Sequence, residues 1–437
     1  MLKVLKFGGS SMADAHQLEK VRSIVEADPA RRVVVVSAAG KRFKDDHKIT
    51  DLLYLCHAHL QYGVSCDGIF DMVRSRYLEI RDELGLSTPL EAEFDALRAK
   101  MDKGISADEL VSRGEYFAAR IMADCLGFDF LDSSLWLHFR MDGTVDQEAS
   151  YQALVHAASG RKVVIPGFYG VLPDGSIHTF SRGGSDITGA LAAAALDADV
   201  YENWTDVSGF LIADPRVVSD PKVISTITYE ELRELSYMGA TVLHEDAIFP
   251  VRTAGIPINI RNTNCPDAPG TMIVSDDNDE VSGYTITGIA GKKGFCAINM
   301  QKAMMNSELG FCRKVLGVLE DNGVNFEHMP SGIDTMSLVI SSAALEGRRD
   351  KLMQSVARAV HPDSVFIEDG LALVAVVGRG MIKAKGTAAR VCDALARADV
   401  NIRMIDQGSS ELNIIVGVDE DEYETAVAAI YGEFVRS

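Results

Sequence analysis

Short apolar runs that alternate with helical patterns are the feature that most limits which folds the first two thirds of this chain can adopt. Helical segments separate the runs, and two of these begin with capping boxes, Ser106 with Glu109 and Thr228 with Glu231. Such alternation predicts an α/β fold built around a mostly parallel sheet. The five strand-like runs are VLKF (4–7), RRVVVVSA (31–38), RKVVIPGF (161–168), DVYENWTD (199–206) and PINIR (257–261).

The last third of the chain contains an internal repeat. Residues 310–341 align without gaps to residues 386–417, and identical residues recur at the same offset, as with Gly310 and Gly386. Each copy has the predicted order strand, helix, strand, strand, helix, which forms an open sheet whose edges tend to pair with another copy. Two small repeats after a large α/β domain indicate a sensor attached to an enzyme.

A change of composition marks the boundary between these parts. Residues 262–283 include NTNCPDAPGT and SDDNDEVSG, which are rich in Asn, Asp, Pro and Gly. We therefore predict domains of residues 1–275, 285–365 and 366–437. Three domains suit a chain of 437 residues.

Charge and composition exclude several classes of function. The formal net charge of −20, with no compensating run of Lys or Arg, argues against a nucleic-acid partner and against an anionic membrane. The start MLKVLKFGG breaks at glycine before a signal-peptide core can form, and no apolar stretch of about 18 residues follows, so we expect a cytoplasmic protein. The seven cysteines form no CxxC pair and fit reduced thiols, and no metal-binding signature is present.

The stretch KFGGSSMAD places two glycines between a predicted strand and a predicted helix. Backbone N–H groups at such a turn attract phosphate, although the chain has no GxxxxGK[ST] motif of a conventional P-loop. Gly8 and Gly9 let the backbone approach a ligand closely, and Ser10 can cap the helix or donate a hydrogen bond. Lys6 adds a positive charge at the strand end. Taken alone, however, Lys6 could be a surface lysine on an edge strand.

A second glycine-rich turn, SRGGSD, leads from a predicted strand into an alanine-rich helix. Arg182 suits bidentate recognition of a carboxylate or a phosphate, and Gly183, Gly184 and Ser185 cluster with it at the helix N-terminus. Asp186 could merely cap that helix. Capping alone does not explain the arginine, so the turn indicates a binding site.

A third candidate lies in NWTDVSGFLIADPR. Thr205 and Asp206 follow a predicted strand, where α/β proteins place ligand groups, and Arg216 follows in the next loop. Thr-Asp at this place can hydrogen-bond a nucleotide base or ribose. A turn built simply from Asp and Gly explains the pattern equally well.

The remaining candidates are a helical carboxylate and two small polar residues. Glu115 shares an apolar stripe of its predicted helix with Val111 and Ala118, so it faces the core and needs a partner. That partner could be a structural cation, a substrate ammonium group or the lysine of the first glycine turn. Ser37 follows the strand VVVV, and Thr50 lies in KITDLL, so both could line the same cleft.

Together these motifs resemble the aspartate kinases. KFGGSS is similar to the KFGGTS opening of that family, and SRGGSD, NWTDVSGF with DPR, GATVLH and IRNT with APGT follow in the family's order. The two repeats resemble paired ACT domains, including the segments SGIDTMSLVI and QGSSELNIIV. The resemblance covers essentially the whole chain, and no homoserine dehydrogenase segment follows the second repeat, so we expect a monofunctional enzyme.

The resemblance implies an amino-acid-kinase fold over residues 1–275, an α/β/α sandwich with a mostly parallel central sheet, followed by two α+β ACT domains. It implies transfer of the ATP γ-phosphoryl group to the β-carboxylate of L-aspartate, giving 4-phospho-L-aspartate, the first step of lysine, threonine and methionine biosynthesis. ATP and Mg²⁺ are the implied cofactors, and phosphates and water would supply most Mg²⁺ ligands. Feedback inhibition by lysine or threonine, or both, at the ACT domains of a homodimer or larger homo-oligomer is also expected.

The same resemblance implies roles for individual residues. Lys6 and Asp186 are the implied catalytic residues, with Lys6 neutralising the phosphoryl group in transfer. The implied aspartate-binding residues are Ser37, Thr50, Glu115, Arg182 and Ser185. The implied nucleotide-binding residues are Lys6, Phe7, Gly8, Gly9, Ser10, Gly183, Gly184, Thr205, Asp206 and Arg216.

The chain departs from the family pattern at three places. The family commonly has GAKVLHP with a lysine that reaches ATP, whereas this chain has GATVLHE, with Thr241 and Glu245. Leu211 stands where an aromatic residue often follows the TDV turn, and Ser10 replaces a threonine but keeps its hydroxyl. The first two differences put two nucleotide contacts in question.

Three other functions fit parts of the sequence. Acetylglutamate, glutamate and nucleoside monophosphate kinases lack the tandem repeats, so residues 285–437 argue against them. An inactive amino-acid sensor of the same fold is opposed by Lys6, Arg182, Asp186 and Glu115. A dehydrogenase with ACT domains would need GxGxxG after a strand, and GRGMIK lacks the last glycine.

Overall fold

The computed structural model describes residues 1–181, 183–239, 245–276 and 284–436, and of residues 245–247 it describes only the backbone. The chain forms two compact units. The first contains Met1–Phe210, Ser225–Tyr229 and Val242–Asn278, and the second contains Leu211–Ile224, Glu230–Thr241 and Asp279–Ser437.

The first unit is built on an eight-stranded sheet with the order β3-β4-β2-β1-β7-β9-β10-β8. All pairs in it are parallel except β9 with β10. Each of the five runs predicted to be strands forms one of its strands, so the expected mostly parallel sheet is confirmed. The strands are β1 (Lys3–Phe7), β2 (Arg31–Val36), β3 (Asp129–Phe130), β4 (Val163–Pro166), β7 (Val200–Thr205), β8 (Thr226–Thr228), β9 (Ile258–Asn262) and β10 (Thr271–Val274).

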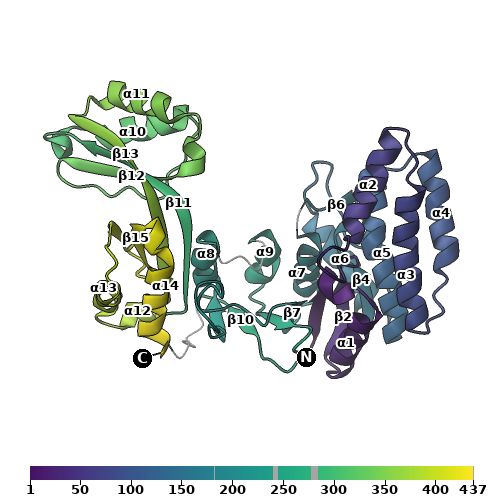
Figure 1. The fold of residues 1–437 in the computed structure, drawn as a ribbon. Coiled ribbons are helices and arrows are strands. Elements are labelled where there is room, and N and C mark those ends of the chain that lie inside the picture. The colour runs from purple at the N-terminus through teal and green to yellow at the C-terminus, as the bar shows by residue number, and fades with distance from the viewer. Residues whose placement is uncertain (182, 240–244, 277–283, 437) are drawn as a thin grey trace. The chain divides into compact units, whose positions relative to one another are not determined.

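Helices cover both faces of this sheet (Figure 1). Helix α5 packs on β2 and β4, and α7 packs on β1, β2 and β7. The predicted cap of α5 is confirmed, because Ser106 Oγ accepts a hydrogen bond from Glu109 N at 3.2 Å. The helices are α1 (Ala15–Glu26), α2 (Ile49–Gln61), α3 (Asp67–Glu83), α4 (Leu90–Lys103), α5 (Ala107–Leu126), α6 (Gln147–Ala158), α7 (Gly184–Ala195) and α9 (Glu245–Thr253), and β5 (Tyr169–Val171) pairs with β6 (Ile177–Thr179).

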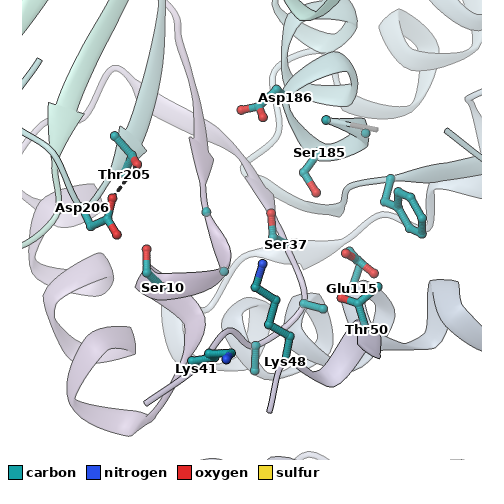
Figure 2. Close-up of a pocket in the computed structure, with 17 residues that line it drawn as sticks. Ser10, Ser37, Lys41, Lys48, Thr50, Glu115, Ser185, Asp186, Thr205 and Asp206 are labelled. Carbon is teal, nitrogen blue, oxygen red and sulfur yellow. Dashed lines mark hydrogen bonds between the residues drawn. The ribbon is translucent and has the colours of Figure 1, made fainter. Parts of the chain in front are cut away.

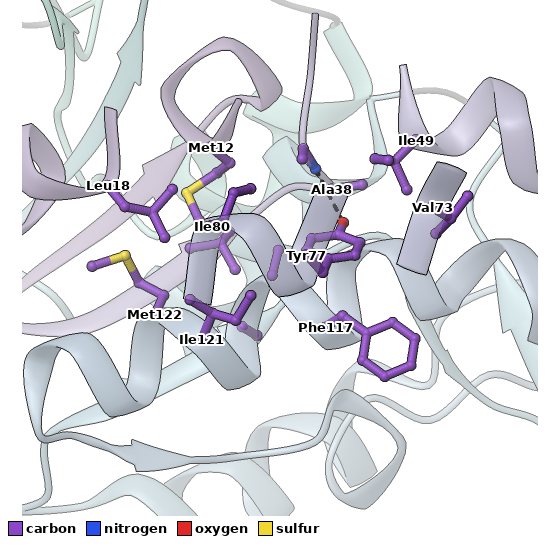
Figure 3. Close-up of a cluster of buried hydrophobic side chains, with 14 of the residues drawn as sticks. Met12, Leu18, Ala38, Ile49, Val73, Tyr77, Ile80, Phe117, Ile121 and Met122 are labelled. Carbon is purple, nitrogen blue, oxygen red and sulfur yellow. Dashed lines mark hydrogen bonds between the residues drawn. The ribbon is translucent and has the colours of Figure 1, made fainter. Parts of the chain in front are cut away.

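An aromatic core holds α3, α4 and α5 together, and Figure 3 shows two of its side chains, Tyr77 and Phe117. The rings of Phe94 and Phe117 stack with centroids 4.0 Å apart, and Tyr77 packs against both. All three side chains are at most 2% exposed. The Tyr77 hydroxyl donates to the Gly114 carbonyl at 2.7 Å and accepts from Ala39 N at 3.2 Å. This core therefore reaches the chain segment that follows β2.

The second unit contains a five-stranded antiparallel sheet with the order β12-β11-β13-β15-β14. The long strands β11 and β13 pair along their length, so both repeats share one sheet. The boundary predicted between residues 365 and 366 falls at the start of β13. The elements are α8 (Tyr229–Tyr237), β11 (Gly288–Gln301), α10 (Phe311–Asp321), β12 (Thr335–Ser341), α11 (Arg349–Val360), β13 (Ser364–Val377), α12 (Gly380–Lys383), α13 (Thr387–Arg397), β14 (Met404–Asp406), β15 (Asn413–Asp419) and α14 (Tyr423–Tyr431).

The repeat in the sequence appears as matching local structure. Helices α10 and α13 occupy equivalent places, and each follows a glycine in the left-handed conformation, Gly310 at φ 77° and Gly386 at φ 88°. A positive φ favours glycine, which explains why both copies have glycine at this point. In the described part of the chain, none of the helices has both the length and the apolar character that a membrane span requires.

Candidate active site

A cavity of about 660 Å³ opens in the first unit, where β1, β2 and β7 end and α7 begins (Figure 2). The carboxyl ends of adjacent parallel strands lie at one edge of a sheet, and this is the usual place for a ligand in an α/β fold. The cavity is lined by Gly8, Gly9, Ser10, Ser37, Ala38, Ala39, Lys41, Lys48, Thr50, Glu115, Phe168, Gly183, Gly184, Ser185, Asp186, Thr205 and Asp206. Most of the residues implied by the resemblance are therefore brought together.

The two glycine-rich turns both line this cavity. Gly9 lies where β1 turns into a short helical segment, and its carbonyl accepts a hydrogen bond from Gly40 N at 2.8 Å. A Cβ atom on Gly40 would lie 2.6 Å from the Gly9 carbonyl, so the two loops can approach this closely only with glycine there. Gly183 precedes α7 in the left-handed region, with φ 58°, and Ser185 lies in the first turn of that helix. A helix N-terminus and two glycine turns suit an anionic ligand.

Lys6 lies just beneath the first glycine turn. Its side chain is only 8% exposed, and its ammonium group pairs with Asp186 Oδ1 at 2.8 Å. The same carboxylate oxygen accepts a hydrogen bond from Asn203 Nδ2 at 2.8 Å. The lysine on β1 is thus joined to Asp186 on α7, which lines the cavity, although Lys6 itself is not among the lining residues. The surface lysine on an edge strand that the sequence left open does not occur.

Glu115 is a buried carboxylate with spare bonding capacity. It lies on α5, is 5% exposed and faces the cavity, as its apolar stripe predicted. Among the described residues, its Oε2 atom has no hydrogen-bond partner. Burial raises the pKa of Glu115 to about 8, although a backbone hydrogen bond from Ala38 lowers it in part. A buried carboxylate of this kind is a strong site for a cationic group of a ligand.

Several small polar groups and two cations complete the lining. Figure 2 shows Ser37 and Thr50 near Glu115, with Thr205 and Asp206 at the opposite end of the cavity. Thr205 Oγ1 donates to Asp206 Oδ1 at 3.2 Å. The loop between β2 and α2 adds the side chains of Lys41 and Lys48. Sequence reasoning missed both lysines, although the charged run KRFKDDHK directly after a buried strand was a usable signal.

Besides Lys6, three of the implied residues, Phe7, Arg182 and Arg216, are not among the described residues that line the cavity. Phe7 is fully buried and stacks on Trp204 with centroids 5.9 Å apart, so only its backbone can take part in binding. Arg216 is in the second unit, where its exposed guanidinium pairs with Asp214 at 2.6 Å. Arg182 and Thr241 lie outside the described residues, as does the side chain of Glu245.

The geometry suits the binding of an anion beside an ammonium group. The lining offers glycine turns, a helix N-terminus, the ammonium groups of Lys41 and Lys48, and a buried carboxylate. Within the described residues, no group of three or more His, Cys, Asp or Glu side chains could hold a metal ion. A polyphosphate that brings its own divalent cation fits such a cavity, with the phosphate oxygens as the main metal ligands.

Fold and cavity together define an amino-acid kinase with a regulatory ACT region. A model of the "Amino acid kinase family" matches residues 1–262, and a model of the "ACT domain" matches residues 374–434. Aspartokinase 3 of Bacillus subtilis is 40% identical over 449 residues, covering 99% of this chain and 98% of that protein.

Solved structures of aspartate kinases are also similar to this chain. The aspartate kinase of Clostridium acetobutylicum is 51% identical, with a TM-score of 0.91 and 99% of both chains covered. Escherichia coli aspartokinase III is 27% identical over 99% of both chains, with TM-scores of 0.68 for its complex with aspartate and ADP and 0.72 for its complex with lysine and aspartate. The chain belongs to the aspartokinase family, and it is an enzyme of the aspartate kinase class.

Proposed function

We propose that the cavity transfers the γ-phosphoryl group of ATP to the β-carboxylate of L-aspartate and releases ADP and 4-phospho-L-aspartate. The observation that carries this proposal is the buried carboxylate of Glu115, whose Oε2 atom has no hydrogen-bond partner among the described residues, in the same cavity as two glycine turns. An amino-acid acceptor needs a site for its ammonium group, and a nucleotide donor needs sites for its phosphates. This cavity offers both.

The residues divide naturally between the two substrates. Glu115 accepts the aspartate ammonium group, and Ser37, Thr50 and Ser185 hydrogen-bond its carboxylates, with Arg182 as a further proposed partner. Gly8, Gly9, Ser10, Gly183 and Gly184 line the phosphate path, and Thr205 and Asp206 hold the nucleoside end. Lys6 neutralises the phosphoryl group in transfer, and Asp186 holds its ammonium group in place at 2.8 Å. The Phe7 ring, which is buried against Trp204, has no part in nucleotide binding.

The chemistry requires charge compensation more than proton transfer. A β-carboxylate with a pKa of about 3.9 is ionised at neutral pH, so it can attack without a general base. One carboxylate oxygen forms the new bond to the γ-phosphorus, and the bond between that phosphorus and the β,γ-bridging oxygen breaks as ADP leaves. Positive charge and oriented N–H groups must stabilise the transferring phosphoryl group. Lys6 and the N-terminus of α7 supply these.

Mg²⁺ fits this cavity as an ion carried by the nucleotide. Phosphate oxygens and water would supply most of its ligands. Bound Mg²⁺ would neutralise the β- and γ-phosphate oxygens.

The direct test is an assay with ATP, Mg²⁺ and aspartate in which hydroxylamine traps the acyl phosphate as a hydroxamate. We expect hydroxamate with aspartate and little with glutamate. Hydroxamate from glutamate alone would contradict the aspartate assignment. Binding of both substrates without turnover would instead favour the inactive sensor.

For regulation, we propose that an amino acid binds the ACT region and inhibits the kinase, with lysine as the first candidate effector. Two facts support this. The E. coli relative was solved with lysine, and the second unit has its own cavity of about 480 Å³ where α12, α13 and the loop before β15 meet. Lys385 and Glu411 line it and could hold the carboxylate and ammonium groups of an amino acid. Titrating lysine and threonine into the kinase assay, separately and together, identifies the effector.

We also propose that the enzyme acts in the cytoplasm as a homodimer or larger homo-oligomer. All seven cysteines are free thiols, which suits a reducing compartment. The edge strands β12 and β14 offer backbone groups that a second copy can pair with. Light scattering at several protein concentrations, with and without lysine, measures the assembly.

A further inference from the structure

The loop between β2 and α2 brings a cation into the cavity that none of the roles above uses. Lys48 ends this loop, directly before α2, and it lines the cavity. Figure 2 shows its side chain extending toward the middle of the cavity, with Ser10 on one side, Thr50 and Glu115 on the other, and Ser37 ahead. Its ammonium group therefore lies between the two sets of binding residues.

Lys48 differs from the other lysines at the cavity in having an uncommitted charge. Within the parts of the chain that the structure describes, its ammonium group has no ion-pair or hydrogen-bond partner. Lys6 is paired with Asp186 at 2.8 Å, and Lys41 Nζ donates to the Lys44 carbonyl at 3.4 Å. Lys48 is thus the cation most readily available to an incoming anion.

The loop that carries Lys48 is anchored by a buried ion pair. Asp46 is 7% exposed and accepts hydrogen bonds from Arg76 Nη2 at 2.8 and 2.9 Å. Arg76, on α3, is 6% exposed and also donates to the Gly40 carbonyl at 3.2 Å. Arg42 donates to the same carboxylate through its backbone N and its Nε, each at 3.0 Å. Both ends of the loop are therefore fixed to one buried carboxylate.

The electrostatics of this anchor indicate a positioning role. Burial raises the pKa of Asp46, but the hydrogen bonds from Arg42 and the charge of Arg76 outweigh it and hold the pKa well below its usual range. The carboxylate is therefore ionised at every pH at which the enzyme would work. A buried ion pair adds little net stability compared with apolar packing, yet it fixes the geometry of the groups it joins. Here it fixes the loop that presents Lys48.

The negative charge of the proposed substrates requires a further cation in this cavity. The cavity already contains the carboxylates of Glu115, Asp186 and Asp206, and the proposed reaction adds a triphosphate and a second carboxylate substrate. We propose that Lys48 contacts the γ-phosphoryl group as a second catalytic cation beside Lys6, and that Asp46 with Arg76 positions it. This proposal rests on the proposed function for the identity of the phosphoryl acceptor, but not for the contact with ATP.

The first experiment compares Lys48→Ala with Lys44→Ala, a matched control on the same loop whose side chain is exposed and does not line the cavity. Calorimetry measures binding of a non-hydrolysable ATP analogue and of ADP, each with Mg²⁺. A lost charge-assisted contact to the γ-phosphoryl group should weaken the analogue roughly tenfold or more and leave ADP within about twofold. Lys44→Ala should change neither, and Lys48→Arg should recover part of the analogue's affinity.

This binding readout separates the present proposal from the proposed function. A wild-type enzyme that binds the analogue but phosphorylates no aspartate contradicts the proposed function alone. Unchanged affinity for the analogue in Lys48→Ala overturns the role of Lys48, whether or not aspartate is the acceptor. Equal losses for the analogue and ADP also overturn it, because the contact would then lie on the α- or β-phosphate.

The second experiment tests positioning with a double-mutant cycle. Asp46→Asn should lower the affinity for the analogue several-fold. Adding Lys48→Ala to this variant should lower the affinity much less than Lys48→Ala does in the wild type, because the released loop no longer presents the lysine. Asp45→Asn, at the exposed neighbouring position, is the control. If Asp46→Asn does not fold, Arg42→Gln removes only the outer, 36% exposed half of the anchor. Fully multiplicative losses would refute the positioning role.

Discussion

The pKa of Glu115 predicts how aspartate binding depends on pH. Because burial raises that pKa to about 8, the empty site holds a neutral carboxylic acid at pH 7, while the aspartate ammonium group needs the charged form. Binding must therefore expel a proton whenever the pH is below the pKa. The apparent dissociation constant of aspartate should rise as pH falls, by about 50-fold between pH 8 and pH 6.

Two measurements test this expectation on the wild-type enzyme. Calorimetric titration of aspartate at pH 6, 7 and 8 gives the affinities, and repetition at pH 7 in buffers of different ionisation enthalpy counts protons. We expect release of about 0.9 proton per aspartate at pH 7. An affinity that stays constant from pH 6 to pH 8, with no proton release, would refute the assignment of Glu115 as the ammonium site.

Glu115→Gln separates this carboxylate from other groups that titrate. The amide keeps the shape but cannot carry the charge, so aspartate binding should become weak and lose most of its pH dependence. Glu109→Gln is the matched control on the same helix, since Glu109 lies nearer the surface and pairs with Lys100. That control should keep the wild-type pH profile. A pH profile that survives in Glu115→Gln would place the titrating group elsewhere.

The raised pKa of Glu115 also predicts how the stability of the ligand-free fold depends on pH. Stability should fall as pH rises, whereas aspartate binding should strengthen. The pKa of this acid is higher in the folded chain than in the unfolded chain, where it is about 4.5. Its contribution to stability is therefore complete only below pH 4.5, and this contribution is lost as the pH rises toward 8. Glu115→Gln should therefore raise the free energy of unfolding of the ligand-free enzyme at pH 8, with an upper limit of about 5 kcal/mol. Urea denaturation at pH 5 and pH 8 checks it, and the gain should shrink at pH 5.

Three further substitutions test other parts of the structure. Lys6→Ala should lower kcat by about 100-fold or more and change the KM for aspartate only a few-fold in steady-state assays, because its charge is needed most in the transition state; an unchanged kcat would exclude that role. Gly40→Ala puts a Cβ atom 2.6 Å from the Gly9 carbonyl, so it should raise the KM for ATP and lower stability by about 1–3 kcal/mol in urea denaturation; full activity and stability would show that the two loops can separate freely. Phe117→Ala removes a ring stacked 4.0 Å from Phe94 and should cost about 3–5 kcal/mol by the same measurement; a loss under about 1 kcal/mol would show that the core refills the space.

Much of the fold could be predicted from the sequence because its signals are local. A buried parallel strand is a short β-branched run, and each of the five runs identified this way is a strand of the large sheet. The repeat likewise predicted equivalent helices at α10 and α13. Glycine turns after β1 and before α7 are also local patterns, and the topology of the sheet brings them to one edge.

Other features could not be predicted because they depend on contacts between distant segments. Nothing near Asp46 in the sequence shows that Arg76, thirty positions later, will bury it. Phe7 looked like part of a binding turn, but its strand lies at the centre of the sheet, so its ring packs on Trp204. The shared sheet of the two repeats follows from the length over which β11 and β13 pair, which the repeat alone does not specify.

Helix α3 shows how residues away from the substrates can determine the chemistry of the site. Two successive residues of this helix contact the segments that line the cavity. Arg76 binds Asp46 and the Gly40 carbonyl, both in the loop after β2. Tyr77 connects that loop to α5, because its hydroxyl accepts from Ala39 N and donates to the Gly114 carbonyl. Because Gly114 has no side chain, α5 can approach the segment after β2 closely. The next residue on α5, Glu115, is therefore shielded from solvent. The packing that Tyr77 holds in place therefore contributes to the burial that raises the pKa of that carboxylate.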